Sequence, residues 1–318
     1  MSSFLKCQVL RPDPGLLILL LVFPLFFFGG PGYDSTRLSK ELWNLGHIMF
    51  FAVFALEADR IWTAGRFATW RKYLLILLLI LALATGIEIC QSFISGRFAS
   101  LRDILFGLAG GLAILAWNAT AQKSADRKIV LRAVAFAVVA VCLIPVSLVA
   151  IDEYRAWRDF PVLSDFESSL EVSRWEAKGR TILVRDPVKN GQYALMVQLN
   201  TDRYSGLALR HFPENWSKAQ ALTFSIYNPG KMITLHYRIH DWKHRGENQA
   251  YFDRYNGHTD LVTGWNTITI PMEAIKNGPK YRKMEMDHIR GFGLFVTEQP
   301  VAKILFLDDV KLMGQVSR

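Results

Sequence analysis

Residues Thr85–Gly111 read TGIEICQSFISGRFASLRDILFGLAGG and place several polar side chains inside an otherwise apolar part of the chain. Glu88 and Gln91 stand three residues apart, so on a helix they share a face and reach the same cavity. Gly107 and Gly111 give the next segment a surface of small residues, against which a second helix can pack closely. Ionisable groups at membrane depth are costly and mark functional sites. The stretch therefore predicts a polar pocket between packed membrane helices.

The first half of the chain contains five apolar segments, and two of them overlap this stretch. They lie at about 16–28, 42–58, 72–93, 101–120 and 129–151. Segments of this length and composition cross a bilayer as helices. Residues 1–151 are therefore predicted to be an α-helical polytopic membrane domain with about five transmembrane helices. The first segment is also short enough for the core of a signal peptide, but the GGPG sequence after it favours an uncleaved span.

The net charge of +9 is distributed as in a membrane protein. Residues 1–150 contain 14 Lys and Arg against 8 Asp and Glu, and residues 151–318 contain 23 against 20. The excess lies in short loops between apolar segments, which argues against a nucleic-acid-binding surface. When successive loops are assigned to alternate sides of the membrane, nine basic residues lie on the side of the amino terminus and four on the other side. By the positive-inside rule the amino terminus is cytoplasmic, and five spans place residues 152–318 outside the cytoplasm.

This topology brings six polar residues to the outer leaflet: His47, Glu88, Gln91, Arg97, Arg102 and Asp103. His47, Glu88 and Asp103 could form an acid–base set, because a carboxylate in a low dielectric can hold a proton near neutrality. The alternative is that they pair with Arg97 and Arg102 and lock the helices together. Since no nucleophile or metal-ligand motif accompanies them in the sequence, pairing or ligand binding is favoured over catalysis.

The same residues resemble a known family. His47 lies in NLGHIMFF, Glu88 and Gln91 in EICQ and Arg97 in GRFAS, followed by Ser100, Asp103 and Gly110. This pattern over residues 35–120 resembles the VanZ-like family of bacterial membrane proteins. The chain departs from the family pattern at Trp43, Asn44 and Gly107. The resemblance implies a cell-envelope protein of the bacterial cytoplasmic membrane, and some members of the family are linked to tolerance of glycopeptide antibiotics.

After Ile151 the composition changes to short alternating strands between turn signals such as Asn190-Gly191 and Asn256-Gly257. Eight strands are predicted, at 193–199, 206–212, 221–227, 232–240, 249–255, 262–270, 290–297 and 303–312. Many short strands without intervening helices are typical of an all-β sandwich. The segments LTFSIYNPG, GWNTITIP and ILFLDDVKL resemble a galactose-binding-like jelly roll of the carbohydrate-binding-module kind, over residues 160–314.

Five residues of the predicted sandwich are candidate ligand-binding residues. Arg238 and His240 alternate with apolar residues and so lie on the polar face of their strand. Tyr251, Tyr255 and Trp265 offer rings that can stack on the apolar face of a sugar. Period-two counting places Trp265 on the face of Thr267 and Thr269 and opposite Ile268 and Ile270.

A structural calcium ion is the one cofactor that the sequence suggests. Asp308 and Asp309 end the last predicted strand, and Glu167 is a candidate partner. Carboxylates of this kind are typical calcium ligands, although a solvated strand end is an equally good interpretation.

The sequence thus favours a membrane-anchored binding protein over an enzyme. Its predicted partners are membrane lipid and a surface glycan or lipid-linked sugar, and no protein partner is indicated. Two alternatives stay open: a membrane enzyme that acts on a lipid-linked or peptidoglycan precursor through His47, Glu88 and Asp103, and a structural scaffold of a polysaccharide export assembly.

Overall fold

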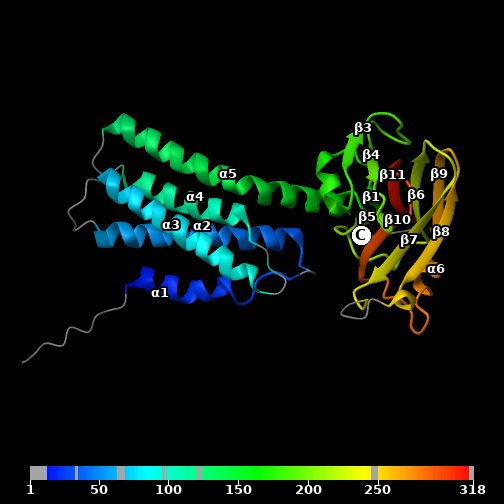
Figure 1. The fold of residues 1–318 in the computed structure, drawn as a ribbon, viewed down its shortest axis with the longest axis horizontal. Helices are drawn as coiled ribbons and strands as arrows, with labels where there is room; N and C mark the ends of the chain where they lie inside the picture. Colours follow the sequence, from blue (N-terminus) through cyan, green and yellow to red (C-terminus); the bar gives the residue numbers. More distant parts are fainter. Residues whose placement is uncertain are drawn as a thin grey trace, which may run out of the picture. The chain divides into compact units, whose positions relative to one another are not determined.

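The computed structural model describes residues 13–32, 35–62, 69–94, 97, 99–119, 124–244 and 250–314 (Figure 1). The chain divides into two compact units, Met1–Val149 and Ala150–Arg318. Four of the basic residues on which the predicted topology depends lie outside the described residues: Lys6, Arg11, Arg66 and Lys123.

The first unit is helical, and its helices follow the predicted apolar segments. They are α1 (Pro14–Val22), the short 3-10 helix η1 (Phe23–Phe26), α2 (Arg37–Trp62), α3 (Thr69–Ser92), α4 (Leu101–Asn118) and α5 (Ala125–Arg158), the last of which continues into the second unit. Among the described residues, three stretches are long and apolar enough to cross a membrane: Trp70–Ser92, Leu101–Asn118 and Ala125–Arg158. Pro14–Phe26 is apolar but shorter. The helical region is therefore confirmed, while five spans remain a prediction.

Helix α2 has the length of a span but a more polar composition, because it directs polar side chains into the helical unit. His47, Glu57 and Asp59 are all buried. Asp59 is paired with Lys72 of α3, whose Nζ lies 2.5 Å from Oδ1. Buried polar groups facing other helices are the usual arrangement in membrane helices.

Small residues on α4 allow the neighbouring helices to approach closely. A Cβ atom added to Gly110 would lie 2.2 Å from the carbonyl oxygen of Ile48 on α2, and one on Gly111 would lie 2.3 Å from the Ile80 side chain on α3. Gly107 faces α2 in the same way. The predicted small-residue surface is confirmed, and it serves two helices at once.

The second unit is a sandwich of two antiparallel sheets (Figure 1). The first sheet has the order β3-β4-β11-β6-β9, with β1 paired to β11: β1 (Val162–Ser164), β3 (Thr181–Val184), β4 (Ala194–Leu199), β6 (Ala221–Asn228), β9 (Gly264–Pro271) and β11 (Lys303–Met313). The second sheet has the order β2-β5-β10-β7-β8: β2 (Trp175–Ala177), β5 (Tyr204–Leu209), β7 (Ile233–Asp241), β8 (Tyr255–Leu261) and β10 (Ile289–Thr297). Three further short helices lie in this unit: η2 (Ser169–Arg174), η3 (Tyr251–Asp253) and α6 (Met272–Lys276).

The predicted sandwich is confirmed, with one strand misplaced and three short ones missed. Seven of the eight predicted strands coincide with observed ones over most of their length, and the eighth meets an observed strand at one residue, Tyr255. The strand predicted at 249–255 is wrong: residue 249 lies outside the described residues, Tyr251–Asp253 form η3, and the strand starts at Tyr255. The turn signal at Asn256-Gly257 was misleading, because both residues lie within β8, where Gly257 packs against the Tyr237 ring.

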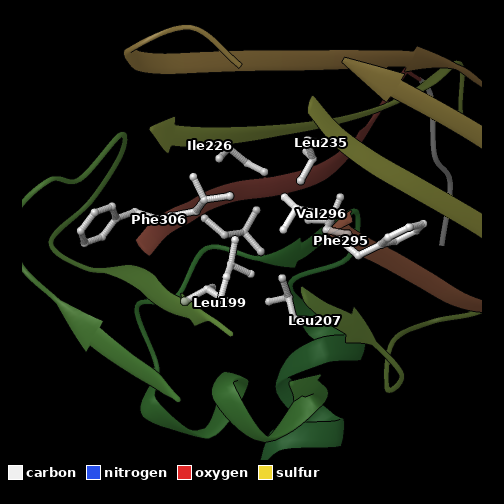
Figure 2. Close-up of a pocket in the computed structure, with 11 residues that line it drawn as sticks. Leu199, Leu207, Ile226, Leu235, Phe295, Val296 and Phe306 are labelled. Carbon is white, nitrogen blue, oxygen red and sulfur yellow. The ribbon is translucent and has the colours of Figure 1, made fainter. Parts of the chain in front are cut away.

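Apolar side chains of both sheets fill the space between them. A residual gap of about 10 Å³ remains there. It is lined by apolar residues including Leu199, Leu207 and Leu235 (Figure 2). A gap of this size and lining has room for about one water molecule but offers it no polar partner. The rings of Phe295 and Phe306 point away from it in opposite directions (Figure 2). The interior is therefore a packed core, and any ligand must bind on an outer face.

Candidate functional site

The outer face of the second sheet carries alternating polar side chains. On β7 the residues Ile233, Leu235, Tyr237 and Ile239 are buried in the core, whereas the residues between them are half-buried on the other face. Arg238 and His240 thus lie on the outer face, as their alternation predicted. Register pairs Arg238 with Gly293 and His240 with Gly291 of β10.

Glycines of β10 make room for these two side chains. A Cβ atom on Gly293 would lie 3.1 Å from Nε of Arg238, and one on Gly291 would lie 2.3 Å from Nε2 of His240. Both side chains therefore lie across β10 instead of extending away from the sheet. The result is a shallow polar surface in which the Arg238 and His240 side chains cover the buried glycines of β10.

A line of rings crosses the same face. Tyr204 of β5 meets Phe295 of β10 edge-on at 5.8 Å between ring centroids, and Phe295 stacks on His236 of β7 at 5.4 Å and 21°. His236 lies 6.0 Å from His258 of β8. We call Tyr204, Phe295, His236 and His258 the ring row. Tyr204 is 50% exposed, and His258 is also exposed, so both ends of the ring row are accessible.

An open depression of about 620 Å³ adjoins the ring row. Its lining includes His236, His258, Thr234, Asp260 and Lys303. Thr234 Oγ1 donates to Asp260 Oδ1 at 2.6 Å. The volume is that of a site for a small ligand, and the lining is rich in hydroxyl, carboxylate, amine and imidazole groups.

His240 is neutral at physiological pH. Burial lowers its pKa to about 4, and the neighbouring His244, Arg210 and Arg238 lower it further, against the opposing effect of its contact with the Asp241 carbonyl. Its Nδ1 donates to that carbonyl at 3.3 Å. A neutral imidazole held in this way adds a polar group to the surface without adding a charge.

The other predicted ligand residues do not share this surface, so the prediction of one common surface is wrong. Tyr255 pairs with Ile239 and therefore points inward, where its ring stacks on Tyr237 at 6.3 Å. Tyr251 lies in η3, 60% exposed, with the guanidinium of Arg254 5.6 Å from its ring. The register of β8, which starts later than predicted, decides the direction of Tyr255.

Trp265 lies on the outer face of the first sheet, on the same face as Thr267 and Thr269, as period-two counting predicted. Its ring is 5.5 Å from that of Tyr227, which is 5.9 Å from Phe306. Trp265 thus belongs to a second, separate aromatic line on the opposite side of the sandwich.

The three predicted calcium ligands do not converge on one point. Glu167 Oε1 accepts hydrogen bonds from the amides of Gln192 and Tyr193, and Asp308 Oδ2 accepts from those of Lys189 and Asn190. The Asp309 carboxylate forms an ion pair with Lys311 Nζ at 2.8 Å. The first two carboxylates hold the loop between β3 and β4. Calcium binding by them remains an untested prediction.

In the helical unit, three of the six predicted pocket residues meet. His47 of α2, Glu88 of α3 and Asp103 in the first turn of α4 each offer a ligand atom, and these atoms lie within 4.8 Å of one another. His47 and Glu88 are 4% and 2% exposed. His47 Nε2 lies 3.6 Å from Glu88 Oε1.

The other three pocket residues have different partners, which corrects the predicted pairing of Glu88 with an arginine. Gln91 Nε2 and Arg97 Nη1 both donate to the carbonyl of Phe26, at 2.8 and 3.0 Å. Arg102 forms an ion pair with Glu41 of α2 at 3.0 Å. The arginines lie nearer to these acceptors than to Glu88, which faces a histidine.

Sequence reasoning missed the ring row and the two glycines that make room for Arg238 and His240. A signal was present in RGFGLF at residues 290–295, where glycines alternate with apolar residues on one strand. Tyr204 and Phe295 become neighbours only through the pairing of β5 with β10, which joins residues far apart in the chain.

Comparison with known proteins identifies the second unit. The sequence model of the carbohydrate binding domain (family 11) matches residues 157–315. No curated protein matches the chain.

Several solved structures are similar to the sandwich. The family 11 carbohydrate-binding module from Clostridium thermocellum in complex with a β-1,3-1,4-mixed-linked tetrasaccharide has 20% identity and a TM-score of 0.38, over 49% of this chain and 96% of that one. An exo-β-agarase has 16% identity and a TM-score of 0.38, over 49% of this chain and 25% of that one. A module specific for non-crystalline cellulose has 15% identity and a TM-score of 0.35, over 49% and 94%.

The matched residues 157–315 span the whole sandwich and half of the chain. Through them the chain belongs to the family 11 carbohydrate-binding domains.

Proposed function

We propose that the protein binds an oligosaccharide on the outer face of the second sheet. The ring row carries the proposal, because it is the feature of this face that matches the apolar side of a pyranose. Tyr204 and Phe295 can stack on sugar rings, and the flanking polar groups can bond to hydroxyls. Membership of the family 11 carbohydrate-binding domains supports the same ligand class.

Arg238 supplies donors beside the ring row, and His240 supplies an uncharged polar group. Because the Arg238 and His240 side chains lie flat over the glycines of β10, an extended sugar chain can lie across β10 and β5. Since the surface is open and the contacts are few, we expect a dissociation constant of about micromolar to millimolar, or roughly 4–8 kcal/mol.

The test is a calorimetric titration of the full chain in detergent with a panel of oligosaccharides. Tyr204→Ala should weaken binding at least tenfold without unfolding, because Tyr204 is half-exposed. Trp265→Ala is the matched control, since it removes an aromatic ring from the opposite sheet and should leave the affinity unchanged. If Trp265→Ala abolishes binding and Tyr204→Ala does not, the ligand lies on the first sheet and the proposal is wrong.

We further propose that the protein is a multi-pass protein of the bacterial cytoplasmic membrane, with five spans and with the sandwich outside the cytoplasm. Apolar side chains exposed on α3 and α5, and the nine-to-four asymmetry of basic residues, support this topology. The glycan would then be a surface polysaccharide or a lipid-linked sugar. Alkaline phosphatase fused after residue 318 should be active, and a fusion in the loop at residue 65 should be inactive. The reverse result would refute the orientation.

A membrane enzyme remains the second candidate function, and one observation favours it. The facing atoms of His47, Glu88 and Asp103 are buried without hydrogen-bond partners, which is unusual for residues with only a structural role. Glu88→Gln would then abolish activity on a lipid-linked precursor while the protein still folds. As part of the same proposal, the resemblance of residues 35–120 to the VanZ-like family suggests that this region acts in the cell envelope and is linked to glycopeptide tolerance.

A further inference from the structure

The helical unit buries polar atoms that have no hydrogen-bond partner. Both ring nitrogens of His47, Oε1 of Glu88 and Oδ1 of Asp103 lack hydrogen bonds. A buried polar group without a partner costs on the order of 1–3 kcal/mol, and more when it is charged. One ligand atom from each of the three side chains lies within 4.8 Å of the other two, which indicates one missing ligand instead of three independent defects.

The geometry indicates what this ligand is. The 3.6 Å between His47 Nε2 and Glu88 Oε1 is too long for a hydrogen bond. Two ligands of a tetrahedral zinc ion, with bonds of about 2.0–2.1 Å, are separated by about 3.3 Å. The observed distance is close to that value. A single cation could therefore contact all three side chains after small side-chain adjustments.

The charge and type of the ligand atoms agree with a divalent cation. Two carboxylates in a buried site carry a charge that must be balanced, and a dication balances both. Imidazole nitrogen favours zinc and its first-row neighbours over magnesium or calcium, whereas carboxylate oxygens accept either class. A mixed set of one nitrogen and two oxygens therefore favours a first-row divalent transition metal.

Neighbouring groups hold the three side chains in place. The Ser100 amide donates to Glu88 Oε2 at 2.7 Å, which leaves Oε1 directed at His47. Ser100 Oγ accepts from the Asp103 amide at 3.3 Å and so caps α4. The Phe26 ring lies 4.7 Å from the His47 ring and covers it. Such outer contacts are typical of metal sites, where they orient the ligands.

We propose that His47, Glu88 and Asp103 form a three-ligand site for a first-row divalent transition metal in the helical unit, with Ser100 as a positioning residue. Three protein ligands leave a coordination position open, as in catalytic zinc sites. This metal site shares no residue with the proposed oligosaccharide-binding surface, so metal binding would be a further property of the protein.

The experiment uses the full chain in detergent without an affinity tag, stripped with a chelator and then equilibrated with Zn²⁺. We expect about one zinc per chain by elemental analysis. His47→Ala and Glu88→Gln should lower the affinity at least tenfold. Ser100→Ala should lower it less, because the Ser100 amide remains.

Two controls separate this site from other zinc ligands in the chain. Glu41→Gln removes a carboxylate of the same helix, and the double variant His236→Ala/His258→Ala removes two histidines of the sandwich. Both should keep one zinc per chain. If zinc binding persists in His47→Ala and Glu88→Gln, or is absent from the wild type, the proposal is refuted.

A second measurement stays decisive if those variants fail to fold. Asp103→Cys, titrated with Co²⁺, should show the intense near-ultraviolet absorption of a thiolate–cobalt bond, which the wild type lacks. A folded Asp103→Cys protein without this band would show that residue 103 is not a metal ligand. Zn²⁺ should also raise the thermal midpoint of the wild type, and no rise would contradict the site.

Discussion

Arg174 and Asp152 form a buried ion pair inside the second unit. Nε and Nη2 of Arg174 donate to Oδ1 of Asp152 at 3.0 and 2.8 Å, and the two side chains are 4% and 1% exposed. Arg174 Nη1 also donates to the Leu163 carbonyl at 3.0 Å. Asp152 lies on α5 and Arg174 ends η2, so the last turns of α5 are part of the structure of the sandwich.

Asp152→Ala should lower the free energy of unfolding of the second unit by about 3–5 kcal/mol, because it leaves a buried guanidinium without its partner. The measurement is denaturant unfolding of the full chain followed by tryptophan fluorescence. Asp159→Asn is the matched control, since the ion pair of Asp159 with Arg158 is exposed and its loss should have little effect. Equal effects of the two changes would contradict a structural role for the buried pair.

The boundary of an independently folding fragment follows from the same pair. A fragment of residues 150–318 keeps Asp152 and should fold cooperatively. One of residues 160–318 lacks it and should be less stable by a similar amount, although it retains the strands of both sheets. Urea unfolding of the two fragments tests this, and equal midpoints would show that α5 does not contribute.

Gly293→Val should weaken oligosaccharide binding about tenfold while the sandwich remains folded. The new side chain would displace Arg238, whose Nε lies 3.1 Å from the position of the Cβ atom, and would push it up from the surface. Valine is well accepted in strands, so stability should change little. Calorimetry measures the affinity, with Thr269→Val on the outer face of the first sheet as the control. Unchanged affinity would place the ligand elsewhere.

His240 should make the sandwich less stable as the pH falls. Its pKa is about 4 in the folded chain against 6.5 as the ordinary value, so between these values the unfolded state binds more protons. The stability is therefore full above about pH 6.5 and is lost progressively down to pH 4. His240→Gln should flatten this part of the curve of unfolding free energy against pH. A variant with the wild-type slope would show that another group is responsible.

Glu171 should have the opposite effect. Burial raises its pKa to about 7, despite the nearby Arg174 and a hydrogen bond from the Phe166 amide. The folded state therefore binds more protons between pH 4.5 and 7, and stability falls as the pH rises through this range. Glu171→Gln keeps an acceptor oxygen for the amide and should be more stable than the wild type at pH 8, by on the order of 3 kcal/mol. The two slopes partly cancel in the wild type, so the single variants are needed to separate them. Equal stability of Glu171→Gln and the wild type at pH 8 would show that Glu171 carries no such penalty.

Local patterns in the sequence were enough to predict a helical unit and a β-sandwich. They also predicted on which face of a strand several side chains lie. Apolar segments of membrane length predicted the helical unit, and alternation along 232–240 placed Arg238 and His240 outside and Ile239 inside. Trp265 also took its predicted face. These predictions succeed because the period of a helix or strand is a property of the local backbone.

Contacts between distant residues were decided by the tertiary structure. The sequence predicted that Glu88 pairs with an arginine, but helix packing directs it to His47. Arg97 instead donates to the Phe26 carbonyl, and Arg102 forms an ion pair with Glu41. Likewise, strand pairing alone makes the ring row from Tyr204, Phe295, His236 and His258, and it turns Tyr255 inward. The sequence by itself determined which residues are polar, apolar or turn-forming. The three-dimensional packing decided which of them meet, because pairing register and helix approach depend on shape complementarity over the whole unit and not on neighbours in the chain.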